Sequence, residues 1–577
     1  MLIQPPAMNK IKSALFFFSV YFIFPSHIFS QTGTIPTGSD TSCASGIALF
    51  QRHYYGNKED GGQCAVATAD GGWVVAGYTN SYGSGGFDGQ VIRLNKHGQI
   101  VWSKAIGGSA EDRFYKIKST ADGGFVAVGH TLSYSSHISA WMVKLDANGV
   151  VQWSRRYDDG NIYGSVAWDV TQTTDGGYAI AGINVLTPGL ANGMVIKTDN
   201  NGNVLWSKSF NSGNSDQATG ILEDAGNLIV SAFHYGQSSS YYDGVIMKLD
   251  LSTGNVIWAR SYEIEGKSNW FASVSKRGSG GYSIYCFNSD DFGNTNPSQV
   301  VVNVDNQGLP VDLRKVTASP ARTIGAFTVT TDGGFLVTQM DMNTSADVYI
   351  GKVSSSGVLQ WSRKVGGTGN QNIVDARQAA DGGYLLVGSN NSTPAIADSS
   401  DMFVIRTDSS GSTPGCSFET TSFQISTPSY TVNSNFNWSS ITNITYSIST
   451  SVTVTSTNTN PAIRTLCFEC MSVPKPTGSA RAIAVSTVSH VVSLYPNPSN
   501  GHLNIIVGAE YNDVAEISVI DWYNGNIIFK SGRQPVFRNS ENQLFFNLTG
   551  KLAHNRYYIV KIRFSDYEQN IKIFSVQ

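Results

Sequence analysis

The sequence predicts an all-β protein: a seven-bladed β-propeller, followed by a small β-rich segment and a C-terminal β-sandwich. Two observations carry this prediction. A unit of about 50 residues recurs seven times, and each unit has the pattern of four short strands. The composition agrees, because the 577 residues include 59 glycines and 11% aromatic residues, a usage typical of short strands joined by tight turns.

The charge of the chain excludes some classes of function. Charged residues make up only 14% of the sequence, and the formal net charge is -3. No basic patch of the kind that binds nucleic acid is expected, so we predict no nucleic-acid partner. At this length the chain should form several domains instead of one hydrophobic core.

The first 30 residues have the order of a secretory signal peptide. Lys10 and Lys12 precede an apolar run over residues 14–24, and small residues follow over 26–30. The run is shorter than the roughly 20 residues that span a bilayer. We therefore expect residues 1–30 to be removed during export, and the mature chain to have no transmembrane segment.

The clearest repeat is Asp-Gly-Gly followed by an aromatic residue and an apolar run. Two degenerate (worn) copies begin at Asp224 and Ser279 and bring the series to seven. The first residues of successive copies are 49 to 55 positions apart. We expect each aspartate to be a structural turn residue whose carboxylate bonds the backbone of its own turn. The five intact copies begin at Asp70, Asp122, Asp175, Asp332 and Asp381.

A large apolar residue recurs 18 to 22 residues before each of these turns. We expect it to pack between blades, with ligand stacking as the alternative. A hairpin turn of the Asp-x-Asn-Gly type commonly precedes it, because Asn and Gly accept positive φ. The seven apolar residues are Phe50, Trp102, Trp153, Trp206, Trp258, Leu313 and Trp361.

The phase of the units predicts how the ring closes. The second unit should form strands over 102–106, 114–119, 125–130 and 141–146. Because the turn over 146–149 is too short to cross between blades, the tryptophan strand should complete the preceding blade. The strand at 50–55 then has no preceding blade, so it is expected to close the ring beside residues 402–408. The propeller spans residues 46–411, with a linear β-solenoid as the alternative.

The repeat ends before residue 412, and residues 412–472 are rich in Ser and Thr. We expect a small capping β-element there, and a linker over residues 473–490. The chain has six cysteines, which can oxidise in an exported protein. A disulfide between Cys416 and either Cys467 or Cys470 is the pairing that we favour.

The last part of the chain has a pattern of its own. A Tyr-Pro-Asn-Pro-x-x-Gly motif precedes an apolar strand, an Asn-Gly hairpin, a second tyrosine and a terminal strand that carries a lysine. This order resembles the type A C-terminal sorting domain, which marks cargo of the type IX secretion system of Bacteroidetes, and it predicts a β-sandwich over residues 491–577. The motif residues are Tyr495, Pro496, Asn497, Pro498, Gly501, Asn555, Tyr557 and Lys572.

Asn555 departs from the family pattern, which usually has glycine there, and asparagine tolerates the left-handed conformation next best. The resemblance implies that the signal peptide takes the chain to the periplasm. The tail would then engage the type IX machinery, which takes the chain across the outer membrane to be secreted or displayed on the cell surface. The repeats themselves resemble bacterial SBBP-like propeller repeats, which specify a fold and not an activity.

The motifs of common enzymes are absent from the sequence: it has no nucleophile elbow, P-loop or dinucleotide fingerprint. Asp146, Asp199 and Asp305 open turns that resemble calcium loops but lack the closing glutamate. We therefore favour no cofactor, with calcium as the alternative.

The leading hypothesis is a secreted or cell-surface binding or adhesion protein that recognises a glycan or a protein. An extracellular propeller enzyme acting on polysaccharide and a structural surface spacer are the alternatives. Recognition is expected in irregular loops rich in Tyr, Ser, Gly and Asn. These loops lie at 78–88, 130–140, 233–243 and 287–299.

Overall fold

The structure is a computed structural model of the whole chain. It forms two compact units, one containing residues 47–471 and the other containing residues 472–577. The residues described are 47–158, 160, 162–187, 190–235, 241–290, 297–318, 325–340, 347–365, 370–391, 400–413, 418–419, 423–438, 440–443, 447–449, 454–471, 491–497, 502–508, 513–521, 527–530, 534–536, 541–547, 556–563 and 568–576.

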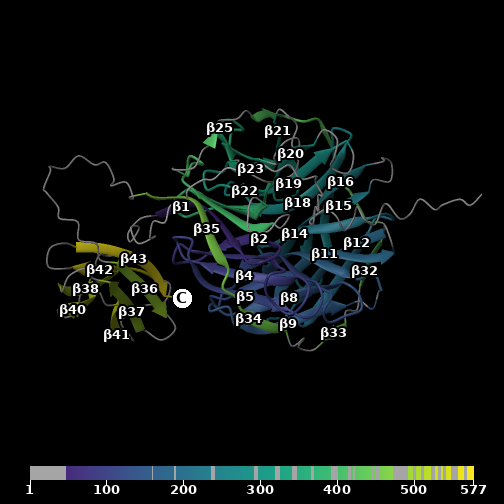
Figure 1. Cartoon of the computed structure of the whole chain (residues 1–577). Helices are drawn as coiled ribbons and strands as arrows, with labels where there is room; N and C mark the ends of the chain where they lie inside the picture. Colours follow the sequence, from purple (N-terminus) through teal and green to yellow (C-terminus); the bar gives the residue numbers. More distant parts are fainter. Residues whose placement is uncertain are drawn as a thin grey trace, which may run out of the picture. The chain divides into compact units, whose positions relative to one another are not determined.

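The first unit is a seven-bladed β-propeller (Figure 1). The described residues contain strands and no helix. No helix that could span a membrane is therefore found among them. Blades 1 to 4 are β2 (Asp60–Ala67), β3 (Trp73–Thr79), β4 (Asp88–Leu94), β5 (Ile100–Gly107); β6 (Asp112–Ser119), β7 (Phe125–Thr131), β8 (Ser139–Leu145), β9 (Val151–Asp158); β10 (Ser165–Gln172), β11 (Tyr178–Thr187), β12 (Leu190–Thr198), β13 (Val204–Asn211); and β14 (Asp216–Asp224), β15 (Asn227–Tyr235), β16 (Tyr242–Asp250), β17 (Val256–Ile264). Blades 5 to 7 are β18 (Ser268–Lys276), β19 (Tyr282–Ser289), β20 (Ser298–Val304), β21 (Pro310–Ala318); β22 (Phe327–Val329), β23 (Phe335–Met340), β24 (Val348–Val353), β25 (Leu359–Val365); and β26 (Gln371–Gln378), β27 (Tyr384–Asn390), β28 (Asp401–Thr407), β1 (Ile47–Tyr55).

Each blade is an antiparallel sheet, and in blades 1 to 6 the four strands run outward from the axis in chain order. Strands β5, β6, β7 and β8 lie at the four ranges predicted for the second unit, and the tryptophan strand β5 completes blade 1 as expected. The first strand of the propeller closes the ring: β1 pairs with β28, with Phe50 opposite Arg406 and Tyr54 opposite Met402. Both predictions from the phase of the repeat are therefore confirmed.

Neighbouring blades interlock through the repeated tryptophan. In blade 2 the hairpin residue Gly149 has a φ of 76°, and a Cβ there would lie 2.8 Å from the Trp102 ring of blade 1. Trp102 also packs edge-on against Phe125, with ring centroids 6.4 Å apart. Phe50 on β1 meets Gly98 of blade 1 in the same way. The tryptophan position is thus part of the packing between blades.

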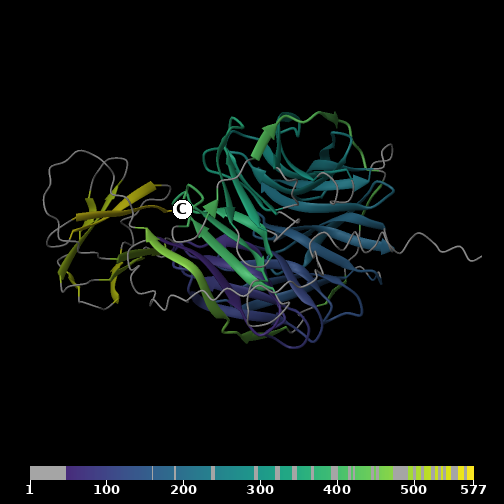
Figure 2. The same cartoon turned by 45° about the horizontal axis from the view of Figure 1, so that its top comes forward.

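The segment after the last blade corrects the prediction of a separate capping element. It adds one strand to the outer edge of every blade, visiting blades 6, 5, 4, 3, 2, 1 and 7 in that order, so that it runs back around the outside of the ring (Figures 1 and 2). We call residues 418–471 the belt. Its strands are β29 (Phe418–Glu419), β30 (Phe423–Ser426), β31 (Tyr430–Asn433), β32 (Ser440–Asn443), β33 (Ser447–Ser449), β34 (Thr455–Asn458) and β35 (Ala462–Met471).

The belt is held by backbone pairing and by apolar anchors. Its last strand β35 pairs with β1 along the full length of β1, from Ile47–Met471 to Tyr55–Ala462. Between β31 and β32, Trp438 is only 7% exposed and packs against Phe210 of blade 3. A strand edge offers unpaired N–H and C=O groups that favour pairing with another strand, which explains why a Ser/Thr-rich segment without a repeat is drawn onto the blades.

The described residues of the second unit form two antiparallel sheets. One has the strand order β36-β37-β41, and the other has the order β39-β38-β42-β43, with β40 beside β38. The strands are β36 (Val491–Asn497), β37 (His502–Gly508), β38 (Asp513–Asp521), β39 (Ile527–Lys530), β40 (Gln534–Val536), β41 (Glu541–Asn547), β42 (Arg556–Arg563) and β43 (Glu568–Val576).

Candidate functional site

The inner strands of the blades surround the propeller axis, and most of them contain a β-bulge. In β6 the bulge lies between Phe114 and Lys116, in β10 between Ala167 and Asp169, and in β26 between Ile373 and Asp375. A bulge re-aims the side chain beside it. The residues that follow these bulges, Lys116, Asp169 and Asp375, all line the same cavity at the axis.

This axial cavity has a volume of about 220 Å³. Its walls come from the inner strands β6, β10, β14, β18, β22 and β26, with β15, β19 and β23 contributing from behind. The space opens beside blade 6, because the inner strand β22 has three residues where the other six inner strands have eight or nine. Gly325, Ala326 and Phe327 form the wall there.

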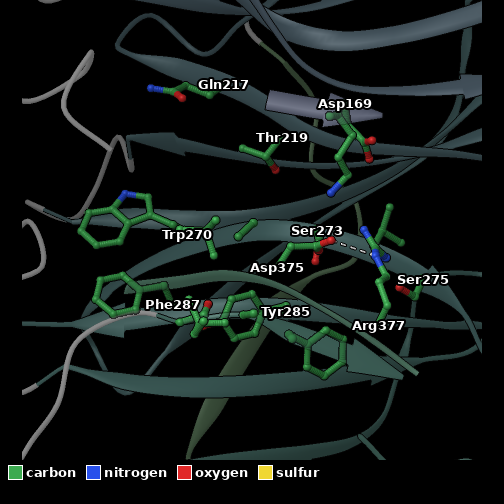
Figure 3. A pocket seen from close by; sticks show the side chains of 18 of the residues that line it. Asp169, Gln217, Thr219, Trp270, Ser273, Ser275, Tyr285, Phe287, Asp375 and Arg377 are labelled. Atoms are coloured by element: carbon green, nitrogen blue, oxygen red, sulfur yellow. Dashed lines mark hydrogen bonds and ion pairs between the residues drawn. The ribbon is translucent and has the colours of Figure 1, made fainter. Parts of the chain in front are cut away.

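The cavity has an aromatic end and a charged end (Figure 3). Trp270 stacks on Phe287 with ring centroids 5.2 Å apart, and Tyr285 stacks on Phe327 at 5.3 Å. Trp270 lies near the start of β18, on the side of the β19–β20 loop. The charged residues lie toward the other ends of the inner strands, on the side of the Asp-Gly-Gly turns.

Both carboxylates of the charged end are engaged by the ring itself. Asp375 accepts the backbone N–H of Ala65 at 2.8 Å and an N–H of Arg377 at 3.0 Å. Asp169 accepts the backbone N–H groups of Val170 at 2.9 Å and Ile221 at 3.1 Å. The bonds to Ala65 and Ile221 join neighbouring inner strands, so the two aspartates hold the ring together at its axis. A carboxylate committed to peptide donors is poorly placed to act as a general base.

Lys116 and Lys118 project into the cavity from one face of β6. Within the described part of the chain, neither ammonium group forms a hydrogen bond or an ion pair. Burial acts to lower the pKa of Lys116, but the Asp169 carboxylate, together with Cys64 and Asp375, outweighs burial and the pKa is raised. For Lys118 the Asp169 carboxylate acts to raise the pKa, but burial and the charges of Lys116 and Arg377 together lower it. The cavity therefore holds cations without direct partners.

The aspartates of the Asp-Gly-Gly turns lie away from this cavity and bond their own turns. Asp122 accepts the backbone N–H of Gly124 at 3.1 Å, and it also lies 2.8 Å from the ammonium group of Lys144. Lys144 is buried on β8 and donates to the carbonyl of Leu145 at 2.9 Å. Sequence reasoning missed this buried cation. The five pairs are Asp70–Arg93, Asp122–Lys144, Asp175–Lys197, Asp332–Lys352 and Asp381–Arg406.

The worn copy of the turn in blade 5 has lost both partners of the pair. In blade 5, Asn303 occupies the position of Lys144, because Val304 lies opposite Tyr282 as Leu145 lies opposite Phe125. There the aspartate has become Ser279, and Asn303 bonds Ser283 at 2.6 Å. The turn carboxylate and the strand cation thus form one structural pair.

The other predicted residues occupy several places. Asp146, Asp199 and Asp305 each accept a backbone N–H of their own hairpin at 2.8 to 2.9 Å. Among the described residues, no group of three or more His, Cys, Asp or Glu is arranged to hold a metal ion. The four irregular loops all join the second and third strands of a blade, so they open on the same face of the ring; residues 236–240 and 291–296 lie outside the described residues.

The cysteines and the sorting motif are placed in part. Cys64 and Cys286 are buried free thiols. Cys467 and Cys470 lie on β35, opposite Gln51 and Ala48, while Cys416 lies outside the described residues, so its disulfide stays a prediction. Tyr495, Pro496 and Asn497 lie on β36, Tyr557 on β42 and Lys572 on β43. The signal peptide, the linker over 473–490, Pro498, Gly501 and Asn555 lie outside the described residues.

No family model and no curated protein matches this chain. Solved structures similar to it include an ulvan lyase of polysaccharide lyase family PL25, at 11% identity and a TM-score of 0.38, with 63% of this chain and 96% of that chain covered. A protein of unknown function from Dyadobacter fermentans matches at 10% identity and a TM-score of 0.38, with 63% and 99% covered. A neuraminidase-like protein of subtype N11 from a flat-faced bat isolate matches at 11% and 0.31, with 51% and 87% covered. Similarity at this level carries no information about activity.

Proposed function

We propose that this chain is an exported binding protein whose ligand site is the axial cavity of the propeller. The observation that carries the proposal is the pair of lysines that face the cavity without a hydrogen bond or ion pair, while the neighbouring carboxylates are committed to the ring. A site that holds polar groups without partners is suited to a ligand that supplies them. The committed carboxylates favour binding over catalysis.

A combined screen of the full chain for binding and hydrolysis tests this proposal. Purified protein is expected to bind at least one extracellular polysaccharide or protein by calorimetry and to release no product from it. Each ligand is tested again with Lys116→Met/Lys118→Met, which should lose binding. Product release that survives this double change would move the function to an enzyme with a site elsewhere on the ring. No binding to any member of the panel would overturn the proposal.

The route of export is also part of the proposal. It is supported by the signal-like order of residues 1–30 and by the sorting motif. In this motif Tyr495 lies on β36 of one sheet and Tyr557 lies on β42 of the other. The type IX machinery would then be the partner of the C-terminal unit, and the ring would be secreted or displayed on the cell surface.

Appending residues 474–577 to a periplasmic reporter is expected to move it outside the outer membrane of a host with a type IX system. Fractionation and protease accessibility of intact cells measure the outcome. The matched control carries Tyr495→Ala and Gly501→Ala in the same tail and should stay periplasmic. An intact tail that leaves the reporter in the periplasm would remove the sorting assignment while leaving the binding proposal standing.

A further inference from the structure

The charge of the axial cavity defines what would neutralise it. Three cationic side chains line it, those of Lys116, Lys118 and Arg377, against the two carboxylates of Asp169 and Asp375. Arg377 is paired with Asp375. The two ammonium groups and the carboxylate of Asp169 then leave a net charge of one positive unit. Neither ammonium group has a direct partner within the described residues. An unpaired charge in a confined site is costly, so the cavity favours a ligand with a single negative group.

The spacing of the two lysines suits one such group. They stand two residues apart on β6, on the same face of the strand, so their Cα atoms are about 7 Å apart. Two ammonium groups on flexible stems can converge on one acid group from this distance. Hydrogen bonds between ammonium and carboxylate or sulfate oxygens are stronger than neutral ones.

The remaining walls suit a body that is both polar and apolar. Ser273, Ser275, Asn372 and Gln217 line the cavity, and within the described residues their side chains make no hydrogen bond. The stacked rings of Trp270 and Phe287 form the opposite end. A hydrocarbon chain would leave these hydroxyl and amide groups desolvated and unpaired, which is unfavourable. A sugar ring supplies hydroxyl groups to bond them and an apolar C–H face to pack on the aromatic end.

We propose that the axial cavity binds one acidic sugar unit of an extracellular polysaccharide, with its carboxylate or sulfate group held between Lys116 and Lys118. This inference rests on the proposed function and gives its ligand class. The volume of about 220 Å³ is below the range of pockets for drug-sized ligands, which fits a single unit. Aromatic packing orients the sugar ring, and the hydroxyl and amide side chains that line the cavity bond its substituents.

Calorimetry of the full chain with four tetrasaccharides tests this ligand class. The probes are oligogalacturonate, the same oligomer as its neutral methyl ester, a sulfated galactose tetramer and the unsulfated galactose tetramer. At least one acidic probe is expected to bind at least about tenfold more tightly than its neutral counterpart, as expected for a charge-assisted contact. Comparing the galacturonate pair with the sulfated pair shows whether the acid group that binds is a carboxylate or a sulfate.

Variants separate a ligand contact from a structural role. Lys118→Met should weaken binding by about tenfold or more while leaving the melting temperature unchanged or higher, because it removes a charge that lacks a partner. Lys96→Met, in the hairpin between β4 and β5, is the matched control and should change neither. A lower melting temperature for Lys118→Met would assign the lysine a structural role and overturn the inference. Equal binding of acidic and neutral probes overturns the inference alone, whereas no binding to any saccharide or protein overturns the proposed function with it.

Discussion

A chain that stops after Thr413 is expected to lose the stable ring. This truncation removes the belt, so all seven blades expose the outer edges that the belt strands pair with. It also removes Trp438 and Phe423, which are 7% and 6% exposed, and deletion of a large buried aromatic side chain costs about 3–5 kcal/mol. Unpaired strand edges in turn favour association between molecules. Thermal unfolding and size-exclusion chromatography should show a large loss of melting temperature and aggregation.

A chain that stops after residue 490 is the matched control. It keeps the belt and lacks only the second compact unit, so its ring should melt at the same temperature as the ring of the full chain. Trp438→Ala in the full chain isolates the anchor from the strand pairing and should cost about 3 kcal/mol. If the two truncated chains had the same melting temperature, the belt would contribute nothing to stability.

Breaking one of the repeated ion pairs should destabilise the ring. The loss of stability should depend on which partner is removed. Asp122→Ser leaves the ammonium group of Lys144, only 4% exposed, without its carboxylate, whereas Lys144→Asn frees a carboxylate that is 52% exposed. Removing one partner of a fully buried pair costs about 3–5 kcal/mol; because Asp122 is half exposed we expect about 2 kcal/mol for Asp122→Ser. Lys144→Asn should cost less. Urea unfolding at pH 7 measures both.

The double variant Asp122→Ser/Lys144→Asn reproduces the residues of blade 5, and it should recover most of the loss caused by Asp122→Ser. Additive costs would contradict a coupled pair. The pH dependence gives a second readout. Burial acts to raise the pKa of Asp122, but hydrogen bonds from Lys144 and Thr120 hold the pKa at about 2. A depressed pKa stabilises the fold above the unfolded value of about 4 and loses that contribution as the pH falls toward 2, so the double variant should lose less stability over this range.

The repeat predicted most of the ring because each blade repeats the same local chemistry. Turn residues such as Asp122-Gly123-Gly124 and the apolar strands between them placed the blades, and the short hairpin turns set the phase that assigned residues 50–55 to the last blade. Leu313 marks the limit of this reasoning. In β21 the residue opposite Asn303 is Asp312 and not Leu313, so blade 5 has no aromatic residue at the tryptophan position.

The belt and the cavity could not be predicted in the same way. Most belt strands have two to four residues, too few to show a period, and their pairing is decided by the backbone edges that the blades offer. The cavity depends on a short inner strand in one blade and on bulges that turn Lys116 and Asp375 toward the axis. The buried cations did leave a signal, since Arg93, Lys144 and Lys352 recur in otherwise apolar strands, but without a structure their partners were unknown.

The double closure at blade 7 has a kinetic consequence. β1 must wait for β28, and then for β35, both encoded hundreds of residues later, so the last contacts to form are those with the greatest separation in sequence. Such a topology folds slowly. The reverse process is slow as well, because β1 is paired along both edges and its release from blade 7 requires both ladders to break. Once assembled, the ring should therefore persist through a high barrier to unfolding, in addition to its equilibrium stability.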